Sequence, residues 1–183
     1  REGRTYCSAT CCAEALDTAL TLKKMHPKTS ISVLYRDIRL PLMGEEFYRE
    51  AREQGITFTR YGVEMPPQVS SIPGGRGLVV DVYDTISMMK LRTAADTIVL
   101  ATPLVPPESN KDISTALKVP LDTNGFFLEA HPKLRPVDFA SDGVYICGTA
   151  HSPMDLERCT SQALGAASRS LIPLMRGVAI AEP

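Results

Sequence analysis

The amino-acid sequence predicts an α/β fold class, with a Rossmann-like parallel sheet and an additional β-meander. Between residues 31 and 60, a β-rich run, an amphipathic helical run and a second β-rich run follow one another, which is typical of a βαβ unit with parallel strands. Two further β-rich runs meet at a turn at Asp84 and Thr85, which indicates an antiparallel excursion.

The first predicted element is a helix from Ala9 to Met25, because apolar residues recur there at helical spacing. The stretch YCSATCC at its start contains three of the five cysteines of the chain, Cys7, Cys11 and Cys12. These three thiols are therefore expected at a helix N-terminus.

The remaining elements follow from the same patterns. The predicted elements are strands at 31–38, 56–61, 77–84, 86–93 and 96–102, a helix at 44–54, a short helix at 111–118, a strand at 143–148 and a helix at 155–175. From Pro103 the sequence becomes rich in proline, which predicts a domain boundary and hence domains at 1–105 and 106–183.

Composition excludes several functions. Twenty Lys and Arg residues balance 21 Asp and Glu residues, and no basic cluster with interleaved aromatic residues occurs, so a nucleic-acid partner is not expected. No run of about 18 apolar residues is present that could span a bilayer. The chain begins without Met, which suits a piece of a longer polypeptide, and a cytoplasmic location is the default expectation.

The spacing C-x-x-x-C-C at a helix N-terminus indicates metal or redox chemistry, because unpaired N–H groups and the helix dipole favour thiolates there. Zinc and iron–sulfur clusters usually need four ligands, so a fourth must come from elsewhere. Cys147 is one candidate, but it falls in a predicted buried strand, and a ligand upstream of Arg1 is preferred.

Three other interpretations remain open for these cysteines. Cys12 could be a small core residue, with the other two thiols incidental. Cys7 and Cys11 could instead cycle through a disulfide in a thiol–disulfide oxidoreductase. The segment could also be a zinc-stabilised interaction module without catalysis. His131 is a candidate proton carrier, although a histidine before proline is more often a turn residue.

Three segments together resemble the heterodisulfide reductase A-subunit family, which includes related flavoprotein subunits of a quinone-interacting membrane-bound oxidoreductase complex. The segments are YCSATCCAEAL, ADTIVLATPLVPP and GFFLEAHPKLRPVDFASDGVYICGTAHSPMDLERCTSQALGAA. The resemblance implies an electron-transfer oxidoreductase with a thioredoxin-reductase-like core. Residues 1–105 would be an inserted nicotinamide-domain-like α/β domain carrying the cysteines, and residues 106–183 the C-terminal part of the FAD-binding domain.

The resemblance also implies roles for particular residues. Three cysteines would bind a 4Fe-4S cluster whose fourth ligand lies outside this chain, and a strand end and a helix start would meet FAD. The implied cluster ligands are Cys7, Cys11 and Cys12, and the implied FAD contacts are Gly148, Thr149, Ala150, Arg158, Cys159 and Thr160. The chain departs from many two-domain flavoproteins at Pro103, where these have Gly, and at Thr149, where these have Asp.

The G-x-G-x-x-G turn that holds the FAD pyrophosphate does not occur in these 183 residues. FAD is therefore expected in the full-length protein, the isolated chain is expected to be inactive, and nicotinamide binding is not predicted. The function implied is electron transfer between flavin and the 4Fe-4S cluster. The implied partners are other subunits of an electron-transfer complex, with association with a membrane complex and a homodimer as further options.

Overall fold

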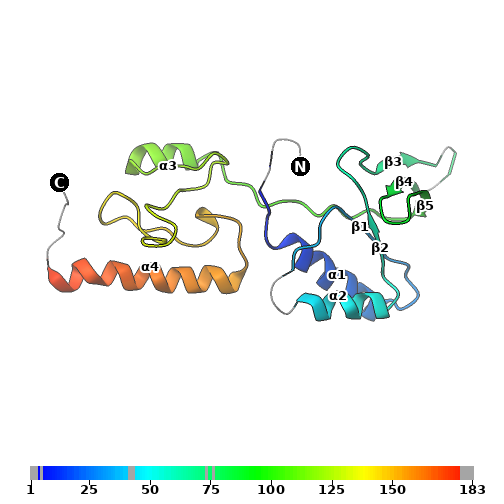
Figure 1. Ribbon diagram of the computed structural model, residues 1–183, viewed down its shortest axis with the longest axis horizontal. Helices are drawn as coiled ribbons and strands as arrows, with labels where there is room; N and C mark the ends of the chain where they lie inside the picture. The colour runs from blue at the N-terminus through cyan, green and yellow to red at the C-terminus, as the bar shows by residue number, and fades with distance from the viewer. Residues whose placement is uncertain (1–3, 5, 41–43, 73, 76, 178–183) are drawn as a thin grey trace. The chain divides into compact units, whose positions relative to one another are not determined.

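The computed structural model describes residue 4 and residues 6–40, 44–72, 74–75 and 77–177. The chain divides into two compact units (Figure 1). Unit 1 joins the residues up to Thr10 to those from Pro103 onward, and unit 2 comprises Cys11–Thr102. These units are defined by contacts, and the assignment of 1–105 and 106–183 to an inserted domain and an FAD-binding domain stays a prediction.

The described residues of unit 2 form two helices and five strands, and the strands lie in two separate sheets. Its elements are α1 Cys11–Met25, β1 Ser32–Tyr35, α2 Gly44–Glu53, β2 Thr57–Arg60, β3 Gln68–Ser71, β4 Leu78–Asp84 and β5 Met89–Ala95. Unit 1 contains α3 Asn110–Leu117, the 3₁₀ helix η1 Gly148–Ala150 and α4 Leu156–Arg176.

The predicted βαβ unit is confirmed. Strands β1 and β2 pair in parallel, with Ser32 opposite Thr57, and α2 lies between them in the chain. Gly55 ends the α2 region with a φ of 79°, a left-handed conformation that a side chain disfavours. The α/β fold class is therefore correct, although the parallel part has only two strands among the described residues.

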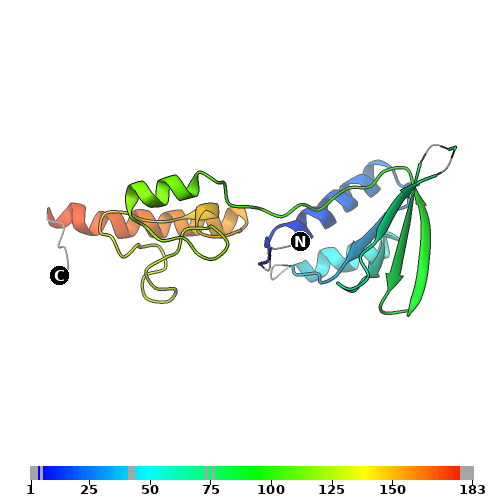
Figure 2. The ribbon, with the colours of Figure 1, turned by 90° about the horizontal axis from the view of Figure 1, so that it is seen from above.

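The core of unit 2 lies between the parallel strands and the two helices, which run next to each other in Figures 1 and 2. Ala51 of α2 is completely buried there, beside Leu16 and Leu20 of α1. Phe58 of β2 packs against this cluster and contacts the ring of Tyr48, with ring centroids 4.7 Å apart. This packing holds α1 against α2 and the parallel strands, and Leu40 in the segment after β1 packs against the same cluster.

The predicted meander is also confirmed. Strands β3, β4 and β5 form an antiparallel sheet, and Asp84 lies opposite Met89 at the turn. The Asp84 carboxylate accepts hydrogen bonds from the backbone N–H groups of Ile86 and Ser87, both at 3.2 Å. These bonds fix the turn and lower the pKa of Asp84, the Ser87 hydroxyl contributing most.

The strand predicted at 96–102 is wrong. The segment has no regular secondary structure, and Val99 and Leu100 are 80% and 78% exposed. It follows β5 at the edge of the meander and has no strand partner among the described residues. Without a neighbouring strand, an apolar run cannot pair its backbone N–H and C=O groups in a sheet, so this segment forms no strand.

Unit 1 consists mainly of loops held by a small core and by α4. Val119, Phe127, Phe139 and Ile146 form the buried cluster. The strand predicted at 143–148 is wrong, because only Tyr145 makes a β-bridge there, to Asp138. The helices predicted at 111–118 and 155–175 are confirmed within one residue at each end.

Lys118 ends α3 in the left-handed conformation, with φ 54° and ψ 43°. Because a side chain strains this conformation and glycine does not, Lys118→Gly is expected to raise the free energy of unfolding by about 0.5 to 1 kcal/mol. The measurement is urea unfolding of unit 1, with Lys111→Gly in the first turns of the same helix as the control. The control should destabilise, and stabilisation of both variants would contradict the explanation.

None of the helices in the described part of the chain combines the length and the apolarity that crossing a membrane requires.

Candidate functional site

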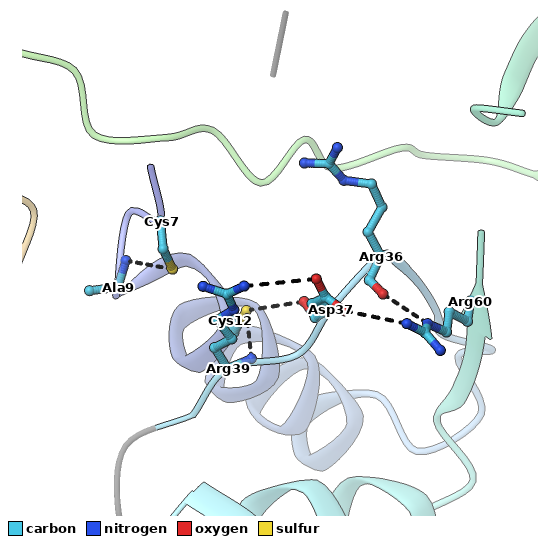
Figure 3. A network of polar contacts seen from close by, with 7 residues as sticks. All are labelled: Cys7, Ala9, Cys12, Arg36, Asp37, Arg39 and Arg60. Carbon is cyan, nitrogen blue, oxygen red and sulfur yellow. Dashed lines mark hydrogen bonds and ion pairs between the residues drawn. The ribbon is translucent and has the colours of Figure 1, made fainter. Parts of the chain in front are cut away.

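The cysteine segment begins in unit 1 with a tight turn around Ala9. Ala9 has a φ of 59°, and the Thr10 N–H donates to the Ser8 carbonyl at 2.7 Å across it. The Ala9 N–H donates to Sγ of Cys7 at 3.4 Å (Figure 3). A non-glycine residue in this conformation is strained, and such strain often accompanies functional segments.

Buried contacts hold this turn in place. Ser8 is 1% exposed, and its hydroxyl accepts a hydrogen bond from the Leu104 N–H at 3.1 Å. The Tyr6 ring contacts the Phe126 ring edge to face, with centroids 5.4 Å apart. The backbone that carries Cys7 is therefore anchored to the loops of unit 1.

Cys11 and Cys12 are the first two residues of α1 in unit 2, as the helical pattern predicts. Sγ of Cys12 accepts a hydrogen bond from the Arg39 N–H at 3.5 Å, and its S–H reaches the Asp37 carbonyl at 3.9 Å (Figure 3). A backbone N–H that donates to sulfur, as that of Arg39 does, stabilises negative charge on the sulfur. The segment after β1 thus supplies the polar environment of Cys12.

Arginines from this segment and from the end of β2 lie beside the carboxyl ends of β1 and β2. The Asp37 carboxylate lies 3.5 Å from the Arg60 guanidinium and 4.0 Å from that of Arg39. The Arg60 Nε donates to the Arg36 carbonyl at 3.0 Å, whereas the Arg36 guanidinium extends away from this network in Figure 3. All four side chains border an open surface pocket.

The chemistry of the cysteine donor set fits an iron–sulfur cluster, for which thiolates are the usual ligands. The sulfurs of Cys7 and Cys12 each accept a backbone N–H. The five cysteines form no disulfide. Among the described residues, however, no group of three His, Cys, Asp or Glu side chains is arranged to hold a metal ion, so the ligand role of the cysteines stays a prediction.

The second predicted site is the turn between the loops of unit 1 and α4. Gly148 begins η1 with a φ of 68°, and a Cβ at this position would lie 3.7 Å from Sγ of Cys159. The Gly148 N–H donates to Oε1 of Gln162 at 2.8 Å. Gly148 and Cys159 are thus brought together, while Thr149 and Ala150 are exposed beside them.

Helix α4 begins at Leu156, two residues before the predicted contact residues. Asp155 is its N-cap, and its carboxylate accepts the Arg158 N–H at 2.8 Å, while its carbonyl accepts the Cys159 N–H at 3.0 Å. The Thr160 hydroxyl donates to the Leu156 carbonyl. The backbone N–H groups of Arg158 and Cys159 are therefore already used in hydrogen bonds to Asp155. The α4 dipole can still stabilise a negative charge near the start of the helix.

Glu129 and His151 are polar residues near this turn that the sequence alone does not single out. Nε2 of His151 lies 2.8 Å from Oε2 of Glu129, and Nδ1 lies 2.7 Å from Nε2 of Gln162. Burial raises the pKa of Glu129, but a backbone hydrogen bond and the His151 hydrogen bond outweigh it, so this pKa lies below its ordinary value.

Glu129→Gln is expected to make stability less dependent on pH. Because the pKa of Glu129 in the folded state lies below its ordinary 4.5, the unfolded chain binds the proton first as pH falls. The stability contributed by this carboxylate is complete above that value and is lost as pH falls through the folded-state pKa. Urea unfolding between neutral and acidic pH should show the difference between wild type and variant shrinking below pH 4.5, and a constant difference would count against this.

Two other residues from the sequence have clear positions. His131 is exposed, and its Nδ1 accepts the N–H groups of Lys133 and Leu134, both at 3.2 Å, so it is a turn residue. Cys147 is exposed rather than buried in a strand, because the segment around it is not a strand.

Comparison with known proteins gives a consistent result. No protein-family model matches the chain. The chain is 39% identical over 168 residues to the A subunit of the ferredoxin:CoB-CoM heterodisulfide reductase of Methanosarcina acetivorans. This match covers 92% of the chain and 20% of that relative. The chain is also 38% identical over 99% of its length to the A subunit of the H(2):CoB-CoM heterodisulfide,ferredoxin reductase of Methanothermobacter thermautotrophicus, covering 27% of that protein.

A further relative is the iron-sulfur A subunit of the CoB--CoM heterodisulfide reductase of Methanocaldococcus jannaschii, 39% identical over 96% of this chain and 26% of its own length. All three relatives are named as reductases. The chain is a homologue of the A subunit of heterodisulfide reductase, and it spans about a quarter of the length of the relatives it matches.

Proposed function

We propose that the chain is part of an electron-transfer oxidoreductase subunit that passes electrons between FAD and a 4Fe-4S cluster. The observation that carries this proposal is the homology to the A subunit of heterodisulfide reductase, one relative of which is named an iron-sulfur subunit. The C-x-x-x-C-C segment falls inside the matched region, which covers 99% of the chain in one relative.

Cys7, Cys11 and Cys12 are proposed as three ligands of the cluster, with the fourth cysteine outside this chain. The hydrogen bonds from the N–H groups of Ala9 and Arg39 to the sulfurs of Cys7 and Cys12 support this assignment. N–H donors to ligand sulfurs spread the negative charge of the site and shift its reduction potential. A bound cluster and flavin would supply the electron-transfer chemistry itself.

The proposed flavin contacts are the turn at Gly148, Thr149 and Ala150 and the start of α4 at Arg158, Cys159 and Thr160. The close approach of Cys159 to Gly148 supports the turn as a compact backbone surface next to a helix N-terminus. The positive end of the α4 dipole is suited to an electron-rich ring or a phosphate. The chain lacks the glycine-rich pyrophosphate turn, so residues beyond it would bind the rest of FAD.

Other subunits of an electron-transfer complex are the proposed partners, because the relatives are named as subunits. The chemistry uses thiols that would be kept reduced, which suits the cytoplasm.

The experiment is anaerobic reconstitution with iron and sulfide, followed by measurement of iron, acid-labile sulfide, zinc and FAD. It is carried out on this chain and on the longer native polypeptide that includes residues upstream of Arg1. The proposal expects FAD together with iron and sulfide in a four-to-four ratio in the native polypeptide, and little of either in this chain alone.

The alternatives predict other results in the same samples. Zinc without labile sulfide would select an interaction module and contradict electron transfer. Thiols of Cys7 and Cys11 that titrate as a reversible pair, with no iron bound, would select thiol–disulfide chemistry instead.

A further inference from the structure

Three side chains connect the Gly148 turn to the rest of unit 1. The Gly148 N–H donates to Oε1 of Gln162 at 2.8 Å, Nε2 of Gln162 lies 2.7 Å from Nδ1 of His151, and Nε2 of His151 lies 2.8 Å from Oε2 of Glu129. The side chains of His151 and Glu129 are only 19% and 12% exposed. Solvent therefore competes little with these contacts, and each proton between them has a defined place.

The donors and acceptors assign those protons. A backbone N–H can only donate, so Oε1 of Gln162 accepts from Gly148. The NH₂ group of Gln162 then faces His151 and can only donate, so Nδ1 of His151 carries no proton. The imidazole is neutral with its proton on Nε2, which donates to the Glu129 carboxylate.

We propose that Gln162 couples the protonation of His151 to the hydrogen bond of the Gly148 N–H. A proton taken up from solvent at Nδ1 places two donors opposite each other across a 2.7 Å contact. The contact is restored when the Gln162 amide rotates by half a turn, so that Oε1 accepts from Nδ1–H. The NH₂ group then faces the Gly148 N–H, which loses its acceptor. Loss of the proton reverses the change.

The charged surroundings permit this proton uptake. Glu129 faces Nε2 of the ring and gains an ion pair when His151 is charged, and Asp122 adds negative charge near Glu129. Gln162, on α4, is neutral. Among the residues that the structure describes, no cationic side chain hydrogen-bonds to His151.

The coupling follows from these contacts alone, whereas its use rests on the proposed function. With FAD at the Gly148 turn, the released N–H becomes one more donor for an electron-rich ligand. Proton uptake by His151 would then stabilise added negative charge at the flavin. Glu129 and Gln162 are positioning residues in this account, because they act through His151 and Gly148.

The test follows the Gly148 amide and the His151 ring by NMR over a range of pH. Cys147–Gly148 is the only Cys–Gly pair in the sequence, so carbonyl-¹³C cysteine combined with ¹⁵N glycine isolates the Gly148 amide signal. Ring ¹⁵N labels report the tautomer of His151. At high pH we expect Nε2–H. As the ring is protonated, the Gly148 amide signal should shift in step, and its hydrogen exchange, corrected for intrinsic pH dependence, should become about tenfold faster.

Gln162→Glu provides the decisive variant because it keeps the size of the side chain. Its two carboxylate oxygens can accept from Gly148 N–H and from Nδ1–H at once, so the Gly148 signal should no longer follow the ring. His131→Gln is the control and should leave the coupling unchanged, since Nδ1 of His131 accepts from the N–H groups of Lys133 and Leu134 in a different turn.

Three results would overturn the proposal. The first is a neutral His151 ring with its proton on Nδ1. The second is a Gly148 amide signal that does not change when His151 is protonated. The third is coupling that persists in Gln162→Glu. If the native polypeptide binds no FAD but the coupling is observed in this chain, the result would instead count against the proposed function alone.

Discussion

Arg169→Met is expected to lower the free energy of unfolding of unit 1 by about 2 kcal/mol, because the buried Asp138 carboxylate then keeps only Arg135, at 4.0 Å, as an ion-pair partner among the described residues. The Asp138 side chain is 5% exposed, and its oxygens accept from Nε of Arg169 at 3.1 Å and from an Nη at 3.0 Å. The pair joins α4 to the loop that bridges to Tyr145. The measurement is hydrogen exchange of the Phe127 amide, which donates to the Ala150 carbonyl at 3.0 Å.

Arg176→Met, on the same helix, is the matched control. Arg176 is exposed in the last turn of α4, where its charge interacts favourably with the helix dipole, so its loss should cost about 0.5 kcal/mol. The double variant Asp138→Asn with Arg169→Met should recover part of the loss, since it removes the buried charge that has lost its closer partner. Equal losses in the two arginine variants would show that the ion pair between Arg169 and the buried Asp138 does not stabilise unit 1.

Leu16→Ala is expected to destabilise unit 2 by about 3 kcal/mol through the cavity it leaves. Leu16 is 3% exposed and belongs to the cluster that packs α1 and α2 on the parallel strands. Because this cluster supports the first turn of α1, the loss should also loosen Cys12. Amide exchange in β1 and β2 measures the stability.

Leu22→Ala in α1 makes the same chemical change at a residue that is 39% exposed. It should cost less than about 1 kcal/mol, because it removes little buried surface and leaves no closed cavity. A loss as large as that of Leu16→Ala would mean that the core described here does not carry the stability of unit 2.

The parts of the fold that the sequence predicts correctly are those with a clear hydrophobic period and a clear end. The α2 segment shows both, with Ala51 on its buried face and Gly55 in a left-handed turn. The runs at 96–102 and 143–148 are as apolar as real strands, but periodicity does not say whether a partner strand lies alongside. Val99 remains exposed for this reason, and Tyr145 makes a single bridge.

For the candidate sites too, the sequence predicts what depends on local pattern and misses what depends on tertiary contacts. The helix N-terminus at Cys11 and Cys12 could be predicted because it depends on local pattern. The contacts of Gln162 with His151 and of His151 with Glu129 join residues 11 and 22 positions apart, and no spacing rule relates them. They depend on how the loops of unit 1 fold against α4, which tertiary packing decides.

Low-temperature EPR of the anaerobically reduced native polypeptide tests the proposal that Cys7, Cys11 and Cys12 bind a cluster. Each of the three cysteines is changed to serine in turn, and Cys147→Ser, at an exposed position outside the segment, is the control. We expect each of the three substitutions to abolish or alter the 4Fe-4S signal and the control to keep the wild-type signal. An unchanged signal in all three variants, or a signal lost in Cys147→Ser, would contradict it.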